Sequence, residues 1–336
     1  MKRLFLVACF IFLLTFGLFS IRSHNSTVPD YPFVSSVKGL PEVTVEVPSG
    51  STGSDIGQIL VKANVVKSSQ AFFKVAVGDP RSEKIAPGAH RLTIEISAIQ
   101  ALEQLLDPNR IPNLIKIYEG GWKSEVVQSL KAYGFTSQDI SSAFREVVLP
   151  QGFNDVEGLL FPAQYTFTQG TTATQAVQAM IDRFVQDATG KLLLRGEGRY
   201  KALQLLTIAS IVQAEGDSKD YPQVARVILN RLSIGMPLQL DSTVHYVKKV
   251  RGEIFLSTQS TLINSPYNTY RRFGLPPGPI GSPGVEAMKA TLNPADGDWL
   301  FFITVAPGDT RFTKSIDEFN LWKALYEKNR KAGAFK

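Results

Sequence analysis

Glu215 ends an apolar segment, TIASIVQAEGD, and a glycine follows it at once. On a helix that turns about 100° per residue, this glutamate shares one face with four apolar residues, Leu205, Ile208, Ile211 and Val212. Apolar neighbours and the partial negative charge of a helix C-terminus both raise the pKa of a carboxyl group. A glutamic acid that keeps its proton near neutral pH can act as a general acid. An ion pair with a basic group, or a side chain that turns into water where the helix ends, is equally compatible with this pattern.

Two later segments carry polar and aromatic residues that suit a neutral sugar polymer. The segment MPLQLDSTVHY contains Gln239, Asp241, Thr243 and Tyr246. The segment NSPYNTYRRFGLPPGPIGSPG contains Tyr267, Asn268, Thr269 and Tyr270 beside a proline-rich loop. Aromatic rings stack on sugar faces, and amide and hydroxyl groups form hydrogen bonds with sugar hydroxyls. The alternative is a long packed loop whose polar groups satisfy one another.

Two helices are expected to position these groups. Gly216 is expected to stop the helix that carries Glu215. The next helix is expected in DYPQVARVILNRLSIG, with Asp220 as a possible N-cap and Gly235 as the stop. Arg231 falls in the apolar stripe of this second helix, so it needs a carboxylate partner or a ligand. We favour an internal ion pair over contact with a substrate.

The start of the chain predicts a membrane anchor. Lys2 and Arg3 precede an uncharged apolar run, residues 4–21. At about 1.5 Å per residue this run is about 27 Å long, close to the hydrocarbon thickness of a bilayer. The positive residues before it favour a cytoplasmic N-terminus, with everything after the run outside the cell membrane. A cleaved signal peptide is the alternative, although no clear small-residue cleavage site follows.

The rest of the chain predicts an α+β protein with more than one domain. Residues 23–42 are polar and proline-bearing, as expected of a tether. Residues 43–150 alternate short strand and helix patterns, which predicts small α+β units without a catalytic constellation. Residues 151–328 contain the segments described above, and we expect them to form a mixed α+β catalytic domain.

Composition restricts the chemistry. The 36 Lys and Arg residues exceed the 30 Asp and Glu residues by six, a mild excess that suits a polyanionic neighbour or simply a solvated surface. These basic residues are scattered without a nucleic-acid-binding signature, so no nucleic-acid partner is expected. The single cysteine, Cys9, excludes an internal disulfide, and the three histidines lack the spacing of a metal site. We therefore expect neither a metal nor a cofactor.

Four segments together resemble the MltG-type (YceG-like) endolytic murein transglycosylases. These segments are ASIVQAEG, ARVILNRLSIGMPLQLDSTVHY, SPYNTYRRFGLPPGPIGSPG and ATLNPADGDWLFF. The resemblance extends from about residue 43 to about residue 325, and the N-terminal anchor fits it. It implies a LysM-like wall-binding region over residues 43–150 and a catalytic domain that cleaves nascent peptidoglycan strands. It also implies that Glu215 is the catalytic residue, with Gln213 in place of an earlier acid of the motif.

A single acid favours a substrate-assisted reaction over the usual pair of carboxylates. Glu215 would protonate the oxygen between MurNAc and GlcNAc, and the muramic C6 hydroxyl would attack C1 to leave a 1,6-anhydro end. Gln239, Asp241, Thr243, Tyr267, Asn268 and Tyr270 are then the expected substrate-binding residues. The expected partners are glycan strands, the membrane and, as a further candidate, peptidoglycan synthases.

Two alternatives to this reaction stay open. In a muramidase, Asp241 would be a second carboxylate and water would be the nucleophile. In a non-catalytic scaffold, the LysM-like region would bind the wall and Glu215 would be dispensable. This sequence also departs from the family pattern, because Ala163, Gln164 and Tyr165 replace the usual Asp-Thr-Tyr and Ser242 replaces a proline. A histidine common after the final strand is absent.

Overall fold

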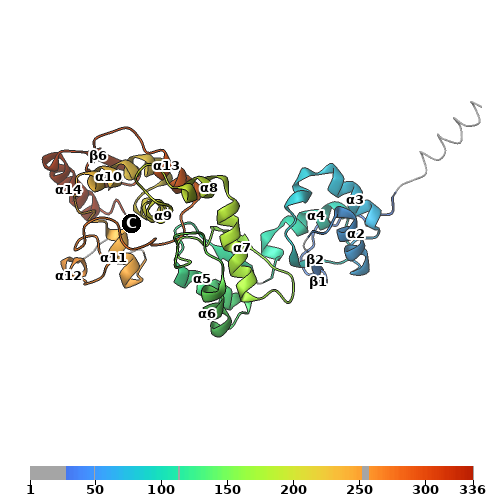
Figure 1. The fold of residues 1–336 in the computed structure, drawn as a ribbon. Helices are drawn as coiled ribbons and strands as arrows, with labels where there is room; N and C mark the ends of the chain where they lie inside the picture. Colours follow the sequence, from blue (N-terminus) through green and yellow to red (C-terminus); the bar gives the residue numbers. More distant parts are fainter. Residues whose placement is uncertain (1–27, 49, 113, 252–256, 336) are drawn as a thin grey trace, which may run out of the picture. The chain divides into compact units, whose positions relative to one another are not determined.

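The computed structural model describes residues 28–48, 50–112, 114–251 and 257–335. The chain divides into two compact units, each of which is described by itself below. Unit 1 comprises Met1–Leu114 and Thr166–Gly170, and unit 2 comprises Ile115–Tyr165 and Thr171–Lys336. Figure 1 shows the helices and strands of both units, coloured along the chain.

Unit 1 is built on two antiparallel strands, β1 (Glu42–Val47) and β2 (Gly88–Thr93), which pair along their whole length. Val45 and Val47 alternate with more exposed residues along β1, as expected of a strand with one buried face. The helices lie between and after the strands: α2 (Gly53–Lys62), α3 (Ser69–Gly78), η1 (Pro80–Lys84), α4 (Ala98–Leu106) and η2 (Pro108–Arg110). The fully buried side chains of this core include Leu60, Phe72, Leu92, Ile96 and Leu102.

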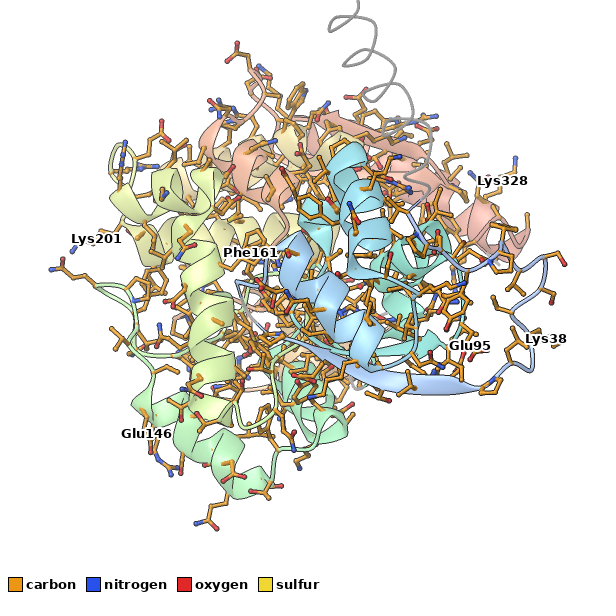
Figure 2. The ribbon with its side chains drawn as sticks, turned by 90° about the vertical axis from the view of Figure 1, so that its right-hand side faces the viewer. Lys38, Glu95, Glu146, Phe161, Lys201 and Lys328 are labelled. Atoms are coloured by element: carbon orange, nitrogen blue, oxygen red, sulfur yellow. The ribbon has the colours of Figure 1, made fainter. Side chains whose placement is uncertain are left out.

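The first part of unit 2 also contains a two-stranded antiparallel sheet. β3 (Ile115–Ile117) pairs with β4 (Ala163–Tyr165) across an excursion through α5 (Lys123–Tyr133) and α6 (Ser137–Glu146). α7 (Ala173–Gln186) follows and packs against α6. Figure 2 labels Glu146, whose exposed side chain marks the last residue of α6.

The second part of unit 2 surrounds one central helix, α9 (Ala202–Glu215). Four helices contact it, and Figure 1 shows them gathered around it: α8 (Ala188–Arg195), α10 (Tyr221–Ser233), α11 (Asp241–Lys248) and α13 (Val285–Leu292). The remaining elements are η3 (Ser218–Asp220), α12 (Thr258–Thr261), β5 (Phe301–Ala306), β6 (Asp309–Thr313) and α14 (Ile316–Lys331). β5 and β6 form a hairpin, and α14 packs on β5.

The mixed α+β class expected from the sequence is confirmed, with small two-stranded sheets in the described residues. The expected membrane anchor, residues 4–21, lies outside the described residues. Among the described residues, none of the helices has the length and apolar character needed to cross a membrane. The LysM-like nature of residues 43–150 stays a prediction.

The domain boundary expected after residue 150 stays a prediction, and the division into compact units lies at another position. It falls after Leu114, so residues 115–150 belong to unit 2. The reason is pairing over a long sequence distance, because Ile115 lies opposite Tyr165 in the β3–β4 sheet. α6 also packs against α7, within unit 2. Local sequence periodicity carries no information about such pairing.

Candidate active site

α9 is enclosed on all sides along most of its length. The side chain of Gln204 accepts a hydrogen bond from the Lys201 N–H at 3.0 Å, which caps the start of the helix. Figure 2 labels Lys201, whose side chain is exposed at this end. Residues 205–212 are all buried, because the helix is apolar around its whole circumference. The sequence predicted a single apolar face, whereas the structure buries the other faces of this segment as well.

Glu215 is the last residue of α9, and the helix ends at Gly216 as predicted. Its side chain is half-buried where the central helix meets the start of α11. The Oε1 atom of Glu215 accepts a hydrogen bond from the Ser242 N–H at 3.1 Å. This bond comes from the first turn of α11, where backbone N–H groups have no partner within the helix. The C-terminal end of α9 therefore places the Glu215 carboxyl group against the N-terminal turn of α11.

Burial is the largest influence on the pKa of Glu215 and raises it above the ordinary value for a glutamic acid. Hydrogen bonding by Ser242 lowers the pKa, and the positive charge of Arg231 lowers it as well. The negative charge of Asp241 acts in the same direction as burial. The net shift is upward, so the carboxyl group keeps its proton to higher pH, as a general acid requires.

Asp241 and Tyr270 form a second polar pair beside Glu215. Asp241 begins α11, directly before Ser242, and its Oδ1 atom accepts a hydrogen bond from the Tyr270 hydroxyl. Burial and this carboxylate both raise the pKa of Tyr270, so the phenol stays protonated and acts as a donor. Glu215 also contributes to that shift in pKa. Three of the predicted site residues, Glu215, Asp241 and Tyr270, are thus brought together at the first turn of α11.

Arg231 lies in the apolar stripe of α10 as predicted, and its hydrogen-bond partners among the described residues are backbone carbonyls. Its side chain is 7% exposed, and its Nε atom donates to the carbonyl of Leu300 at 2.6 Å. Its Nη1 atom donates to the carbonyl of Leu238, and the guanidinium lies over the ring of Phe301. The expected internal ion pair with a carboxylate is therefore replaced, among the described residues, by contacts with two carbonyls and an aromatic ring. Arg231 ties α10 to two other segments, and it acts on Glu215 through its charge.

Thr243 and Asn268 are enclosed by protein, so direct contact with a substrate does not fit either residue. Both are 0% exposed. The Thr243 hydroxyl donates to the carbonyl of Leu240 at 2.7 Å and lies 3.0 Å from the Thr269 hydroxyl. The Asn268 amide donates to the carbonyls of Thr261 and Ile263 at 3.0 and 2.8 Å, and its oxygen accepts from the Tyr270 N–H at 3.0 Å. These side chains hold the loop that carries Tyr270.

Replacement of Asn268 by alanine is expected to destabilise unit 2 by about 2–3 kcal/mol, because it leaves buried backbone groups without partners. Asn264→Ala is the matched control, since Asn264 is exposed and its side chain accepts a hydrogen bond from the exposed Arg272 side chain at 3.1 Å. The control is expected to change the free energy of unfolding by at most about 0.5 kcal/mol. Denaturant unfolding of both variants measures the difference. Equal stability of the two would show that Asn268 does not hold the loop.

Gln239 and Tyr267 have different surroundings from the Glu215 group. Gln239 is exposed, with a left-handed backbone (φ 46°), and its N–H donates to the carbonyl of Thr269 at 3.2 Å. Tyr267 is half-buried and lines a cavity of about 280 Å³ together with Glu157, Tyr246 and the proline-rich loop. A larger cavity of about 570 Å³ is formed by β3, α5 and Arg251, and its lining contains none of the predicted site residues. That Gln239 and Tyr267 contact a substrate stays a prediction.

Gln213 and Ser210 attach the proline-rich loop to α9. The Gln213 oxygen accepts from the Gly284 N–H at 2.8 Å, and its amide donates to the Tyr221 hydroxyl at 2.6 Å. The Ser210 hydroxyl accepts from the Ile280 N–H at 3.0 Å. An amide side chain suits the position of Gln213 because it must accept one hydrogen bond and donate another.

Sequence reasoning missed two residues that shape this region, Ser242 and Glu157. Both the side chain and the backbone N–H of Ser242 lower the pKa of Glu215, and the N–H contact at 3.1 Å is one that no side-chain pattern reveals. Glu157 is 5% exposed, and it precedes the apolar stretch Gly-Leu-Leu-Phe. A charged residue beside a buried run was the signal that singled out Glu215, and it could have singled out Glu157 as well.

Comparison with known proteins identifies the family of this chain. Residues 45–324 match the YceG-like family. The "Endolytic murein transglycosylase" of Bacillus subtilis (strain 168) is 31% identical over 320 residues, which cover 86% of this chain and 86% of that protein. The protein of the same name from Streptococcus pneumoniae (strain D39) is 28% identical over 297 residues, which cover 78% of this chain and 54% of that protein.

A solved structure shares both sequence and fold with this chain. The 2.6 Å crystal structure of a YceG-like protein from Listeria monocytogenes is 28% identical, with a TM-score of 0.55. The match covers 83% of this chain and 98% of that one. The chain therefore belongs to the YceG-like family, as the sequence resemblance predicted.

Proposed function

We propose that this chain is a membrane-anchored endolytic lytic transglycosylase that cleaves the β-1,4 bond between MurNAc and GlcNAc in nascent peptidoglycan and so limits strand length. Membership of the YceG-like family and the transglycosylase names of its relatives support the reaction class. The single observation that carries the proposal is the carboxyl group of Glu215, held at the end of a buried helix with a raised pKa. This is the environment that a general acid needs.

Glu215 performs both proton transfers of the reaction. Its neutral carboxyl group donates a proton to the glycosidic oxygen as the bond from that oxygen to muramic C1 breaks. The muramic C6 hydroxyl attacks C1 and returns its proton to the Glu215 carboxylate. One bond to C1 is exchanged for another, so the cycle consumes no water and closes with Glu215 protonated again. The product strand ends in a 1,6-anhydro ring.

The surroundings of Glu215 suit a group that changes charge during the cycle. The Ser242 N–H donates to Oε1 at 3.1 Å and stabilises the carboxylate formed by the first step. The positive charge of Arg231 acts in the same direction. Asp241 and burial act in the opposite direction and favour return of the proton. The pKa of Glu215 is raised, yet groups that stabilise the carboxylate and groups that favour the protonated acid both act on it, so the side chain can release its proton and take one back.

The proposed location places this chemistry beside the membrane. Residues 4–21 would span the bilayer, with Lys2 and Arg3 on the cytoplasmic side. The expectation that all of residues 23–42 form a flexible tether needs correction, because Val28, Val34 and Val37 pack against the core of unit 1. The Gln100 side chain accepts from the Val34 N–H at 3.0 Å and donates to the Val34 carbonyl at 2.7 Å. A flexible tether would therefore be shorter than this segment, and unit 1 would lie closer to the membrane. Glycan strands would meet the enzyme as they leave their synthases, which are the partners that this location favours. Residues 43–150 would add LysM-like contacts to the wall.

The role of Asp241 separates a transglycosylase from a hydrolase with two carboxylates. As an electrostatic neighbour, Asp241 raises the pKa of Glu215. Asp241→Asn is then expected to lower that pKa and to move the alkaline limb of the pH–rate profile to lower pH, with activity retained at acidic pH. The Asn oxygen can still accept the Tyr270 hydrogen bond. Loss of activity at every pH would instead assign Asp241 a direct part in the reaction.

Digestion of purified glycan strands in ¹⁸O-water tests the proposed reaction. A transglycosylase leaves 1,6-anhydro ends and incorporates no label, because no water enters the product. A muramidase leaves reducing ends that carry ¹⁸O. A non-catalytic scaffold binds the strands without shortening them. Either of the last two results would contradict the proposed function.

A further inference from the structure

Glu157, in the turn before β4, is a buried carboxylate of unit 2. The side chain is 5% exposed. Its Oε1 atom accepts from the Lys123 N–H at 2.9 Å, at the first residue of α5. Its Oε2 atom accepts from the Tyr246 hydroxyl at 2.8 Å. Both oxygens are therefore engaged, one at a helix N-terminus, where negative charge is stabilised, and the other by a phenol.

Tyr246 connects this carboxylate to α11. It follows Ser242 by four residues, so the two lie one turn apart on the same side of the helix. Its ring packs edge-on against Trp122, with ring centroids 5.9 Å apart, and at a tilt of 46° against Tyr267, with centroids 5.2 Å apart. The hydroxyl and the ring together fix α11 against the start of α5. The same helix brings the Ser242 N–H to 3.1 Å from Glu215.

A second path fixes the segment of Glu157 against α9. Gly158 has φ +84°, and a Cβ atom there would lie 2.7 Å from Pro279, so the backbone and the proline ring are in close contact. The next residue of that loop, Ile280, donates its N–H to Ser210 on α9 at 3.0 Å. The segment that carries Glu157 is therefore fixed to α9 through the proline-rich loop. From this segment, Glu157 holds α11 through the Tyr246 hydroxyl.

We propose that Glu157 is a positioning residue, which holds α11 through the Tyr246 hydroxyl and so keeps the Ser242 N–H on the carboxyl group of Glu215. This inference rests on the proposed role of Glu215 as the acid. Glu157 itself faces Lys123, Asp155, Tyr246 and Tyr267 around the 280 Å³ cavity, and none of the contacts of Glu157 is with Glu215. Its effect on the reaction is therefore indirect.

The inference predicts a defined change in the acid. Two residues of α11 act on the pKa of Glu215: Ser242 lowers it and Asp241 raises it, and the effect of Ser242 is the larger. Arg231, on α10, also lowers this pKa. When α11 is held less firmly, the influence of Ser242 weakens and the pKa of Glu215 rises. The carboxylate formed after proton transfer also loses a donor. The rate of the chemical step should therefore fall, and the alkaline limb of the pH–rate profile should move to higher pH.

Tyr246→Phe in the full-length enzyme tests this inference, because it removes one hydroxyl and keeps the ring. We expect kcat for glycan cleavage to fall by about tenfold, the lower end of the range for one hydrogen bond to a charged group. We also expect a KM within about twofold of wild type and the alkaline limb at higher pH. Tyr118→Phe is the matched control, since Tyr118 is 71% exposed and lies outside this chain of contacts.

Variants of Glu157 separate positioning from simple loss of stability. Glu157→Gln can still accept from the Lys123 N–H and can donate to the Tyr246 hydroxyl, so it should retain most of the activity. Glu157→Ala loses both bonds and should be at least as slow as Tyr246→Phe. The double variant Glu157→Ala, Tyr246→Phe should be no slower than Glu157→Ala alone, because both changes break one interaction.

The possible outcomes distinguish this inference from the proposed function. A Tyr246→Phe enzyme that melts at a lower temperature but keeps wild-type kcat and pH limb would overturn the inference and leave Glu215 as the acid. A limb that moves to lower pH would also overturn it. An active Glu215→Gln enzyme would instead overturn the proposed function.

Discussion

Glu215→Gln is expected to reduce the rate of glycan cleavage by at least about a thousandfold, within the range that general acid–base catalysis supplies. The substitution keeps the size of the side chain and an oxygen that can accept a hydrogen bond from the Ser242 N–H. In the wild-type chain this N–H lies 3.1 Å from the Glu215 Oε1 atom. It removes the carboxyl group that donates the first proton of the proposed cycle and accepts the second. Glycan strand length after incubation with the purified full-length variant measures the loss.

The same variant should not be less stable than wild type at neutral pH. The pKa of Glu215 is raised in the folded protein, so the folded state binds this proton more tightly than the unfolded state. That contribution to stability is fully present below the unfolded pKa and is lost as pH rises through the folded pKa. Glutamine has no proton to lose, so the stability of the variant should lack this component of the pH dependence.

Glu286→Gln is the matched control for this prediction. Glu286 lies on α13, its side chain is 64% exposed, and it pairs with Lys289 at 2.8 Å. Surface pairs of this kind contribute little to stability, and this one is not among the residues placed at the site. Glycan cleavage by Glu215→Gln within a few-fold of the Glu286→Gln rate would remove Glu215 from the mechanism.

Arg231→Met is expected to destabilise unit 2 by about 4 kcal/mol. The side chain is 7% exposed, and methionine fills similar space without any donor. The carbonyls of Leu238 and Leu300 would lose their hydrogen bonds, at a cost of about 1–3 kcal/mol for each buried group left unpaired. Chemical denaturation followed by a probe in unit 2 gives the free energy of unfolding.

An exposed arginine provides the comparison for Arg231. Arg271 also donates to a backbone carbonyl, that of Leu262 at 2.8 Å, but it lies at the surface, where water can replace the bond. Arg271→Met should therefore change the free energy of unfolding by at most about 0.5 kcal/mol. If Arg231→Met were as stable as Arg271→Met, the two buried carbonyl contacts would not hold α10 in place.

Some features of the site could be predicted because they depend on residues close together in sequence. The helix of Glu215 and its end at Gly216 follow from an apolar run with a terminal glycine. The proximity of Asp241 and Tyr270, 29 residues apart, came from the family resemblance and not from periodicity. The proposed reaction likewise depends on that resemblance, which the family match supports.

Other features could not be predicted because they depend on how the loop packs. The sequence predicted Asn268 as a sugar-binding amide, whereas in the structure its side chain forms hydrogen bonds with three backbone groups. Arg231 was given a carboxylate partner because a buried charge needs compensation, whereas two carbonyls and an aromatic ring provide its contacts. The pairing of Ile115 with Tyr165 assigned residues 115–150 to unit 2, and no local pattern encodes it.

The pKa of Glu215 itself tests the central claim most directly. Full-length protein with ¹³C-labelled glutamate carboxyl groups can be titrated by NMR, with Glu215→Gln used to assign the signal. The account predicts a midpoint above 4.5, the ordinary pKa of a glutamic acid, because burial outweighs the hydrogen bonds of Ser242. A midpoint at or below 4.5 would show that Glu215 is ionised at neutral pH like a surface glutamate, which would contradict its role as the proton donor.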